Sequence, residues 1–307
     1  MHVRDSVTLC CWDHVEYLPK RKPMSLFVPR GMGWSCDVPD PRDVTSRDEE
    51  IVHLLKQLRT RGKSPERIDW REFFTPVQDQ GQLGSSSAHA IVSVIQYFQR
   101  RAMGRLSEPS VLFVYQTALR LLKRHGDSGV TLRSALRSII HYGFPAEDTW
   151  PYCAERLDDM ADAFVHASAE KISGLRFVRL DERHASGEET LRQVRSFLAA
   201  GFACAFGFPV CKTLTTDGDI HFPTVYDGIR GGQAVVAVGF DDNRRIRSDK
   251  GALLVRSSWG SHWGRNGYGW LPYAYVRECL AGDFWTAITP QWIESGEFYQ
   301  PTPSEPG

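Results

Sequence analysis

Two stretches of sequence decide the fold: Gln80–Ala88, which reads QGQLGSSSA, and Arg256–Tyr268, which reads RSSWGSHWGRNGY. A third stretch, Gly231–Gly239, reads GGQAVVAVG and lies between them in the chain. The first is a glycine-broken loop that leads into a helix whose apolar face is formed by Ile91, Val94, Ile95 and Phe98. The chain therefore presents, in this order, a helix start, a buried strand and a tryptophan–glycine turn.

Together the three stretches resemble the papain-like cysteine peptidases, in the order of that family and over roughly residues 68–290. The pattern Trp-Gly-x-x-Trp-Gly-x-x-Gly-Tyr, which begins at Trp259, is specific. The segments Gly31–Asp43 and Leu271–Tyr273 look like the free-standing bacterial branch of the family. The resemblance implies an α+β fold of two lobes, one helical and one an antiparallel, barrel-like β lobe, with a cleft between them.

Three regions are predicted along the chain: residues 1–66 as an N-terminal extension, residues 67–170 as the helical lobe, and residues 171–307 as the β-rich lobe with a C-terminal tail. A capping box at Ser46 and Glu49 predicts one amphipathic helix in the extension. We expect the extension to pack on the outside of the lobes as a brace. The alternative, that it occupies the cleft as a family propeptide does, stays open.

Periodicity predicts further elements within the lobes. Helices are expected at about residues 110–123, from about residue 130 to a left-handed cap at Gly143, and at about residues 188–200. A short strand is expected to begin at Ile68. Further strands are expected at Phe202–Phe208, Ala234–Phe240, Ala252–Ser257, Tyr268–Pro272 and Phe284–Ile288, with a turn at Asp241–Asn243.

The family's chemistry needs a cysteine nucleophile at the start of the long helix, a histidine base, an asparagine that orients the histidine, and a glutamine that stabilises the oxyanion. The resemblance places Ser86, Gln233 and Ser257 at the first three positions. At the fourth position Gln80 keeps the family's glutamine, and Trp259 keeps the tryptophan that shields the histidine–asparagine pair. A glutamine side chain cannot accept a proton at physiological pH. Loss of a nucleophile–base unit costs about 10⁶ in kcat, so the sequence predicts a pseudopeptidase.

Binding residues follow from the same resemblance. Gly129 matches the glycine through which the family holds extended peptides, so a peptide or peptide-like molecule is the expected ligand of the cleft. His89, three residues after Ser86, shares its helix face and is either a replacement base or a buried histidine of the helical lobe. His221 and His262 are weaker candidates for an acid–base role.

Two other functions remain open. The first is a repurposed, non-proteolytic biosynthetic enzyme of the cyclase, lyase or isomerase type, in which Gln80 still polarises a carbonyl group. The second is a serine-dependent peptidase or amidase that uses Ser86 with His89 or another base.

Composition limits the expected partners, location and cofactors of the protein. The 307 residues carry 37 basic and 37 acidic side chains, so the balance of charge favours neither nucleic acid nor an anionic membrane as a partner. No apolar run has the length of a membrane span. Seven scattered cysteines predict reduced thiols and a cytoplasmic location. No metal-ligand or nucleotide-binding pattern is present, so neither a metal nor a cofactor is expected.

Overall fold

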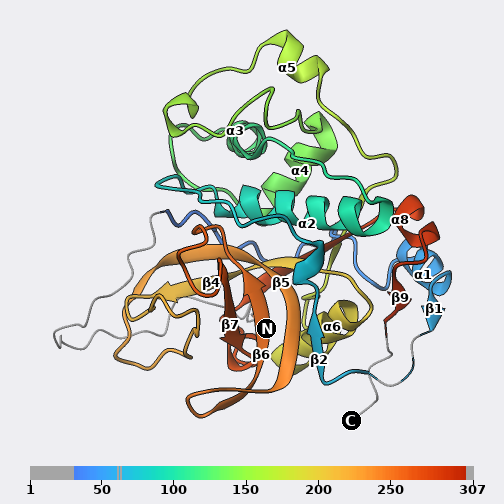
Figure 1. Ribbon diagram of the computed structural model, residues 1–307, viewed down its shortest axis with the longest axis vertical. Helices are drawn as coiled ribbons and strands as arrows, with labels where there is room; N and C mark the ends of the chain where they lie inside the picture. Colours follow the sequence, from blue (N-terminus) through green and yellow to red (C-terminus); the bar gives the residue numbers. More distant parts are fainter. Residues whose placement is uncertain (1–30, 61, 63, 302–307) are drawn as a thin grey trace, which may run out of the picture.

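The computed structural model describes residues 31–60, 62 and 64–301, which form two lobes (Figure 1). The upper lobe in that view is helical, and the lower lobe is built on a β-sheet. The α+β fold with two lobes is thus confirmed. The helical lobe contains α2 (Ser86–Met103), α3 (Val111–Leu121), α4 (Leu132–Tyr142), α5 (Ala163–Ala167) and the short 3₁₀ helix η2 (Ala154–Arg156).

In the described residues, the sheet lobe has seven strands in a single antiparallel sheet. They run in the order β3-β8-β4-β5-β6-β7, and β2 pairs with β5 beside this path. Because β3 and β7 are the two ends of the order, the sheet is open rather than the expected barrel-like closure. Its strands are β2 (Arg67–Asp69), β3 (Arg176–Arg179), β4 (Cys204–Cys211), β5 (Ile229–Ile246), β6 (Asp249–Arg256), β7 (Tyr268–Pro272) and β8 (Gly282–Ile288).

The sequence predicts six of these strands but misplaces one turn. β5 continues through Asp241–Asn243, where the pairing with β6 shifts register between Asp241 and Arg245. The hairpin turns later, next to Arg247, which has a φ of 54°. A bulge therefore explains the polar residues that had indicated a turn. β3 was not predicted, because it is short and carries charged residues. The short strand expected to begin at Ile68 is β2.

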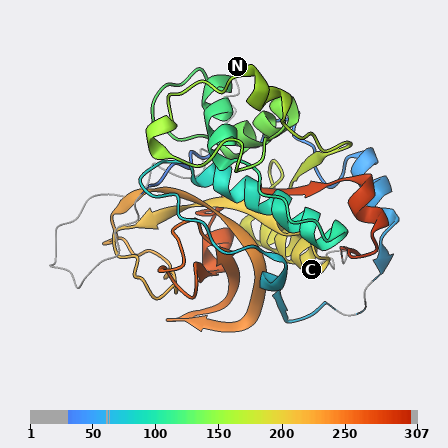
Figure 2. The ribbon, with the colours of Figure 1, turned by 45° about the horizontal axis from the view of Figure 1, so that its top comes forward.

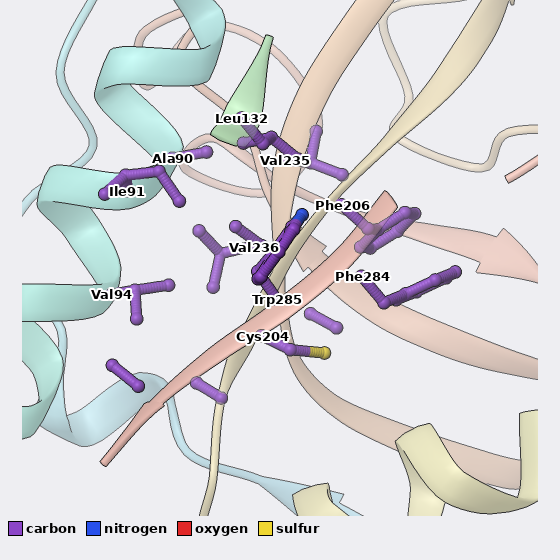
Figure 3. Packing of buried hydrophobic residues seen from close by; sticks show 14 of the residues in the cluster. Ala90, Ile91, Val94, Leu132, Cys204, Phe206, Val235, Val236, Phe284 and Trp285 are labelled. Atoms are coloured by element: carbon purple, nitrogen blue, oxygen red, sulfur yellow. The ribbon is translucent and has the colours of Figure 1, made fainter. Parts of the chain in front are cut away.

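The long helix α2 is the centre of the core. Ala90, Ile91 and Val94 on α2 face Val235 and Val236 on β5 (Figure 3). The next layer in the same view is formed by side chains of β4 and β8, namely Cys204, Phe206, Phe284 and Trp285. This packing fixes the first turn of α2 against β5, which is where the motif residues of both lobes meet.

Side-chain caps set the ends of the other long helices. Ser110 Oγ accepts the Phe113 amide at 3.1 Å to start α3, and Thr131 Oγ1 accepts the Ser134 amide at 3.1 Å to start α4. The helix predicted near residues 188–200 is α6 (Gly187–Ala199). Gly143 ends α4 with φ 72° and ψ −155°, so the expected left-handed cap is wrong, although only glycine adopts this conformation readily.

The extension contributes α1 (Glu49–Lys56), which packs against α8 (Pro290–Glu294) (Figure 2). The predicted capping box is wrong, because the helix begins one residue after Asp48 and the Asp48 carboxylate accepts the Thr45 amide. The short strands β1 (Arg59–Thr60) and β9 (Tyr299–Gln300) pair in parallel nearby. This part of the extension does brace the outside. The remaining elements are η1 (Arg71–Phe73) and α7 (Ala274–Arg277).

Two predictions about the whole chain can be compared with the described residues. Within residues 31–60, 62 and 64–301, no helix is long and apolar enough to cross a bilayer. None of the five cysteines in this part of the chain is in a disulfide, and Cys10 and Cys11 lie outside the described residues.

Candidate functional site

Ser86 is the first residue of α2 and is completely buried. Its hydroxyl oxygen accepts the backbone N–H of Ala234 on β5 at 3.2 Å. This bond joins the helix start of one lobe to the strand of the other, immediately beside Gln233. The structure therefore brings together the two positions that the resemblance assigns to nucleophile and base.

Gln80, Gln233 and Ser258 form a buried cluster of hydrogen bonds. Gln80 Oε1 accepts from Gln233 Nε2 at 2.9 Å and from Ser258 Oγ at 2.5 Å. Gln233 Nε2 also lies 3.1 Å from Ser258 Oγ. The Gln80 amide nitrogen donates to the Leu83 carbonyl at 2.8 Å. Every member is an amide or an alcohol, so the cluster holds no group that exchanges a proton near neutral pH.

Sequence reasoning did not single out Ser258, although it stands next to Ser257 in the tryptophan–glycine motif. Ser258 is the serine that enters the amide cluster, whereas Ser257 Oγ accepts the backbone N–H of Trp259 at 3.2 Å. Trp259 is buried, and its ring meets Trp263 edge to face at 5.0 Å. The motif tryptophans thus pack over the turn that carries both serines.

His89 forms its hydrogen bonds with Ser85 and not with Ser86. Its Nδ1 lies 3.2 Å from the Ser85 carbonyl oxygen and 3.3 Å from Ser85 Oγ. A carbonyl only accepts, so the bond to it places the proton on Nδ1 and leaves that nitrogen unable to take one from Ser85. Tyr152 stacks edge to face on the imidazole, and its hydroxyl lies 2.6 Å from Ser85 Oγ. Burial lowers the pKa of His89 to about 4, so the ring is neutral at pH 7.

Gly129 lies across the cleft with its backbone already engaged. Its N–H donates to the Tyr115 hydroxyl at 3.1 Å, and its carbonyl accepts from Arg124 at 3.1 Å. The next amide, that of Val130, points into the cleft and donates to the Gly33 carbonyl at 3.0 Å. The main-chain bond to residues 31–36 is thus made by Val130, the residue after Gly129.

The two weaker acid–base candidates, His221 and His262, do not contact Ser86. His221 is buried in the connection between β4 and β5 and lies 3.0 Å from Thr213 Oγ1 and 3.7 Å from Asp227. Burial lowers its pKa. His262 is exposed on the motif turn. Cys204 is fully buried on β4, and burial raises the pKa of its thiol, so it is a packing residue and not an accessible nucleophile.

The cleft is occupied by the chain's own residues 31–36. Trp34 forms a parallel β-bridge with Val130 of the helical lobe. Its amide also donates to the Gly232 carbonyl of β5 at 3.2 Å. The expectation that the extension lies wholly outside the lobes is therefore wrong for this part. We call residues 31–43 the strap. In Figure 1 the strap is the blue trace that passes behind α2 toward α1.

Glycines on both sides allow the strap to lie this close. A Cβ atom at Gly33 would stand 1.6 Å from the Gly84 carbonyl oxygen, and one at Gly129 would stand 2.4 Å from the Gly33 carbonyl oxygen. The Trp34 indole fills space that a side chain at Gly207 would take, since a Cβ there would stand 1.9 Å from the ring. Trp34 is 6% exposed. Strap and cleft are complementary in shape, which the sequence alone did not reveal.

Little open space remains beside the motif residues. A space of about 10 Å³, lined by residues that include His89 and Ser257, has room for about one water molecule. A larger groove of about 420 Å³ lies elsewhere, between the end of α3 and residues 157–160. In the part of the chain that the structure describes, no group of three or more histidine, cysteine, aspartate or glutamate residues could hold a metal ion.

Comparison with known proteins gives a consistent result. The family model for papain family cysteine proteases matches residues 64–284. An uncharacterized peptidase C1-like protein of Acanthamoeba polyphaga mimivirus is 32% identical over 278 residues, covering 84% of this chain and 86% of that protein. Papain from Carica papaya is 28% identical over 216 residues, covering 66% of this chain and 54% of papain.

Among solved structures, xylellain, a cysteine protease from Xylella fastidiosa, superposes with a TM-score of 0.67 at 27% identity. The match covers 89% of this chain and 99% of xylellain.

Proposed function

The chain belongs to the papain family of cysteine peptidases, and from that premise we propose that it does not hydrolyse peptides and instead binds a peptide-like ligand in the cleft between its lobes. The neutral hydrogen-bond cluster of Gln80, Gln233 and Ser258 is the observation that carries the proposal. Within this cluster Gln233 stands at the position that the resemblance assigns to the family's histidine base.

Loss of hydrolysis is expected because no group in the site can take the proton of the Ser86 hydroxyl. A serine hydroxyl becomes a nucleophile only when a base takes its proton. The hydroxyl of Ser86 accepts a backbone N–H, and the neighbouring Gln233 side chain offers amide atoms that titrate far outside the physiological range. Gln80, the family's oxyanion donor, directs its amide nitrogen to the Leu83 carbonyl. The site therefore has neither the activated nucleophile nor the base that formation of an acyl-enzyme requires.

Peptide binding is supported by how the cleft holds the strap. The strap runs as an extended backbone, and it exchanges hydrogen bonds with the helical lobe at Val130 and with the sheet lobe at Gly232. A groove that pairs with main-chain groups on both walls suits an extended peptide of varied sequence. An external ligand would reach these groups by displacing the strap.

Hydrolysis of fluorogenic peptides tests the first half of the proposal. We expect no turnover by the wild-type chain. We expect turnover when Ser86→Cys, Gln233→His and Ser257→Asn are combined in a chain that also carries Gly33→Ala to free the cleft. The matched control retains Ser86 and carries the other three changes. Cleavage by the wild-type chain that disappears in Ser86→Ala would overturn the proposal.

A serine hydrolase is the alternative with a specific observation in its favour, because Ser85 and His89 are paired at the start of α2. The protonated Nδ1 and the buried hydroxyl argue against it. A fluorophosphonate probe separates the two ideas, since labelling lost in Ser85→Ala or Ser86→Ala would establish a reactive serine. A repurposed enzyme instead predicts turnover of a small metabolite by the wild-type chain, and the filled cleft gives such a carbonyl substrate little room.

A further inference from the structure

The strap is fastened by charged side chains that join it to both lobes. Arg133 of α4 pairs with Asp37 at 2.5 Å and with Asp43 at 2.6 Å. Arg179 of β3 lies 3.4 Å from the same Asp43 and donates to the Asp37 carbonyl at 2.8 Å. The two aspartates of the strap therefore hold one arginine from each lobe.

Two further carboxylates share Arg179. Asp181 lies 2.9 Å from its guanidinium, and Asp283 lies 3.4 Å from it. The cluster thus contains four aspartates but only two arginines, and the side chains of Arg179 and Asp283 are 1% and 0% exposed. Excess negative charge is costly where water cannot screen it. A cluster of this composition favours holding a proton on one of its carboxylates.

Asp283 is the carboxylate that connects this cluster to the cleft. Its Oδ2 accepts the Trp34 indole N–H at 3.3 Å, and its Oδ1 accepts the Trp285 indole N–H at 2.7 Å. The charged groups around it are Arg179 and Asp181 on the sheet side, Asp37 and Asp43 on the strap, and Arg133 on α4. Burial raises the pKa of Asp283 to about 7, and Arg179 opposes that rise.

We propose that the strap is a pH-dependent closure of the cleft, held shut while Asp283 carries a proton and loosened when Asp283 ionises. The neutral carboxyl group still accepts both indole N–H groups, so protonation keeps Trp34 in place. Ionisation adds a buried charge beneath the indole. Release of Trp34 then admits water to Asp283 and relieves that charge.

The direction of the pH effect follows from the thermodynamic linkage between proton binding at Asp283 and opening of the strap. The closed state, with its raised pKa, binds the proton more tightly than an open state in which Asp283 is hydrated and has an ordinary carboxyl pKa. Lower pH therefore favours closure, and opening grows as the pH rises from the ordinary carboxyl range, about 4, toward about 7. Between these two pKa values one proton changes the ratio of open to closed molecules by about tenfold per pH unit, and above about pH 7 the ratio levels off because Asp283 is ionised in both states.

Amide hydrogen exchange followed by mass spectrometry measures the closure without a ligand or an activity. The reporters are the amides of Trp34 and Val130, which bond to Gly232 and Gly33. After correction for the intrinsic exchange rate, we expect their protection to fall by about tenfold per unit from about pH 5 to 6.5. We expect it to level off above about pH 7.5, where Asp283 is ionised in both states.

Asp283→Asn is the decisive variant, because an amide of the same shape cannot ionise. It replaces one of the two acceptor oxygens by an NH2 group, so the level of protection can change, but the pH dependence should disappear. The control Asp219→Asn, in the surface pair with Arg244, should behave as wild type. A flat wild-type profile between about pH 5 and 6.5, or an Asp283→Asn profile that still falls there, would overturn the proposal.

Trp34→Phe gives a second test if Asp283→Asn does not fold. It keeps an aromatic ring but removes the N–H donor that favours the ionised carboxylate, so the pH at which opening levels off should move upward. An unchanged levelling-off pH would contradict the proposal.

The inference rests on the proposed function only in that an open strap frees the ligand groove. Hydrolysis by the wild-type chain would overturn the proposed function alone, and pH-independent exchange in an inert chain would overturn the closure alone.

Discussion

Gly33→Ala is the sharpest test of the filled cleft. An alanine Cβ at this position would stand 1.6 Å from the Gly84 carbonyl oxygen and 2.2 Å from its carbon. Both of those atoms belong to the backbone just before α2, so they cannot move aside as a flexible side chain could. The strap itself must therefore leave its present path.

The size of the effect follows from what the strap loses. Two hydrogen bonds join the strap to the lobes, from Trp34 to Gly232 and from Val130 to Gly33, and contribute about 1 kcal/mol each. Burial of the Trp34 side chain, now 6% exposed, contributes roughly 2–3 kcal/mol. Loss of all three terms, about 4 kcal/mol, would raise the open fraction by about 10³.

Binding of a labelled peptide in trans measures this opening. The peptide has the sequence of residues 31–40 and carries a fluorophore for anisotropy. We expect Gly33→Ala to bind it and the wild-type chain to bind it at least 10²-fold more weakly. A 10²-fold difference corresponds to about 2.8 kcal/mol, which is less than the roughly 4 kcal/mol that the strap loses. Gly62→Ala is the matched control, because a Cβ there meets no atom within 4 Å. Equal binding by the wild-type and Gly33→Ala chains would refute the argument.

Two further predictions concern stability. Because burial lowers the pKa of His89 to about 4, this residue must be neutral in the folded chain, so stability present above pH 6.5 is lost as the pH falls. We expect the free energy of unfolding, measured in urea, to fall by about 2 kcal/mol by pH 5. This loss should be absent from His89→Gln and unchanged in the exposed control His262→Gln. Identical pH profiles of stability for the wild-type and His89→Gln chains would contradict the prediction. Phe98→Ala removes a fully buried ring stacked on Trp292 at 4.8 Å and should cost about 3–5 kcal/mol, whereas Leu106→Ala, 74% exposed, should cost less than about 0.5 kcal/mol. Equal denaturation midpoints for these two variants would refute the packing argument.

Motif residues were the part of the site that sequence reasoning placed well. The structure brings Gln80, Ser86 and Gln233 to one point between the lobes, as their order in the chain implies. Local periodicity gave the helices to within a few residues. It failed where tertiary context decides, as at Asp241–Asn243, where polar residues sit on a strand that extends past its bulge.

His89 shows the limit of spacing as an argument. Its separation from Ser86 placed both on one helix face, yet its hydrogen bonds go to Ser85, four residues before it. Spacing along a helix fixes the direction of a side chain only to within a fraction of a turn. Which hydroxyl it meets depends on Tyr152, which comes from a distant segment and closes over the ring.

The amino-acid sequence by itself determined the family, the two-lobe fold and the neutral character of the motif positions, because each of these is written in short contiguous patterns. Only the tertiary structure decided that Gly31–Asp43 lies in the cleft and that Asp283 lies beneath Trp34. Those two residues are 249 positions apart. Close approach of such segments depends on backbone contacts and missing Cβ atoms at glycines from both lobes, and no local pattern records which glycines will face each other.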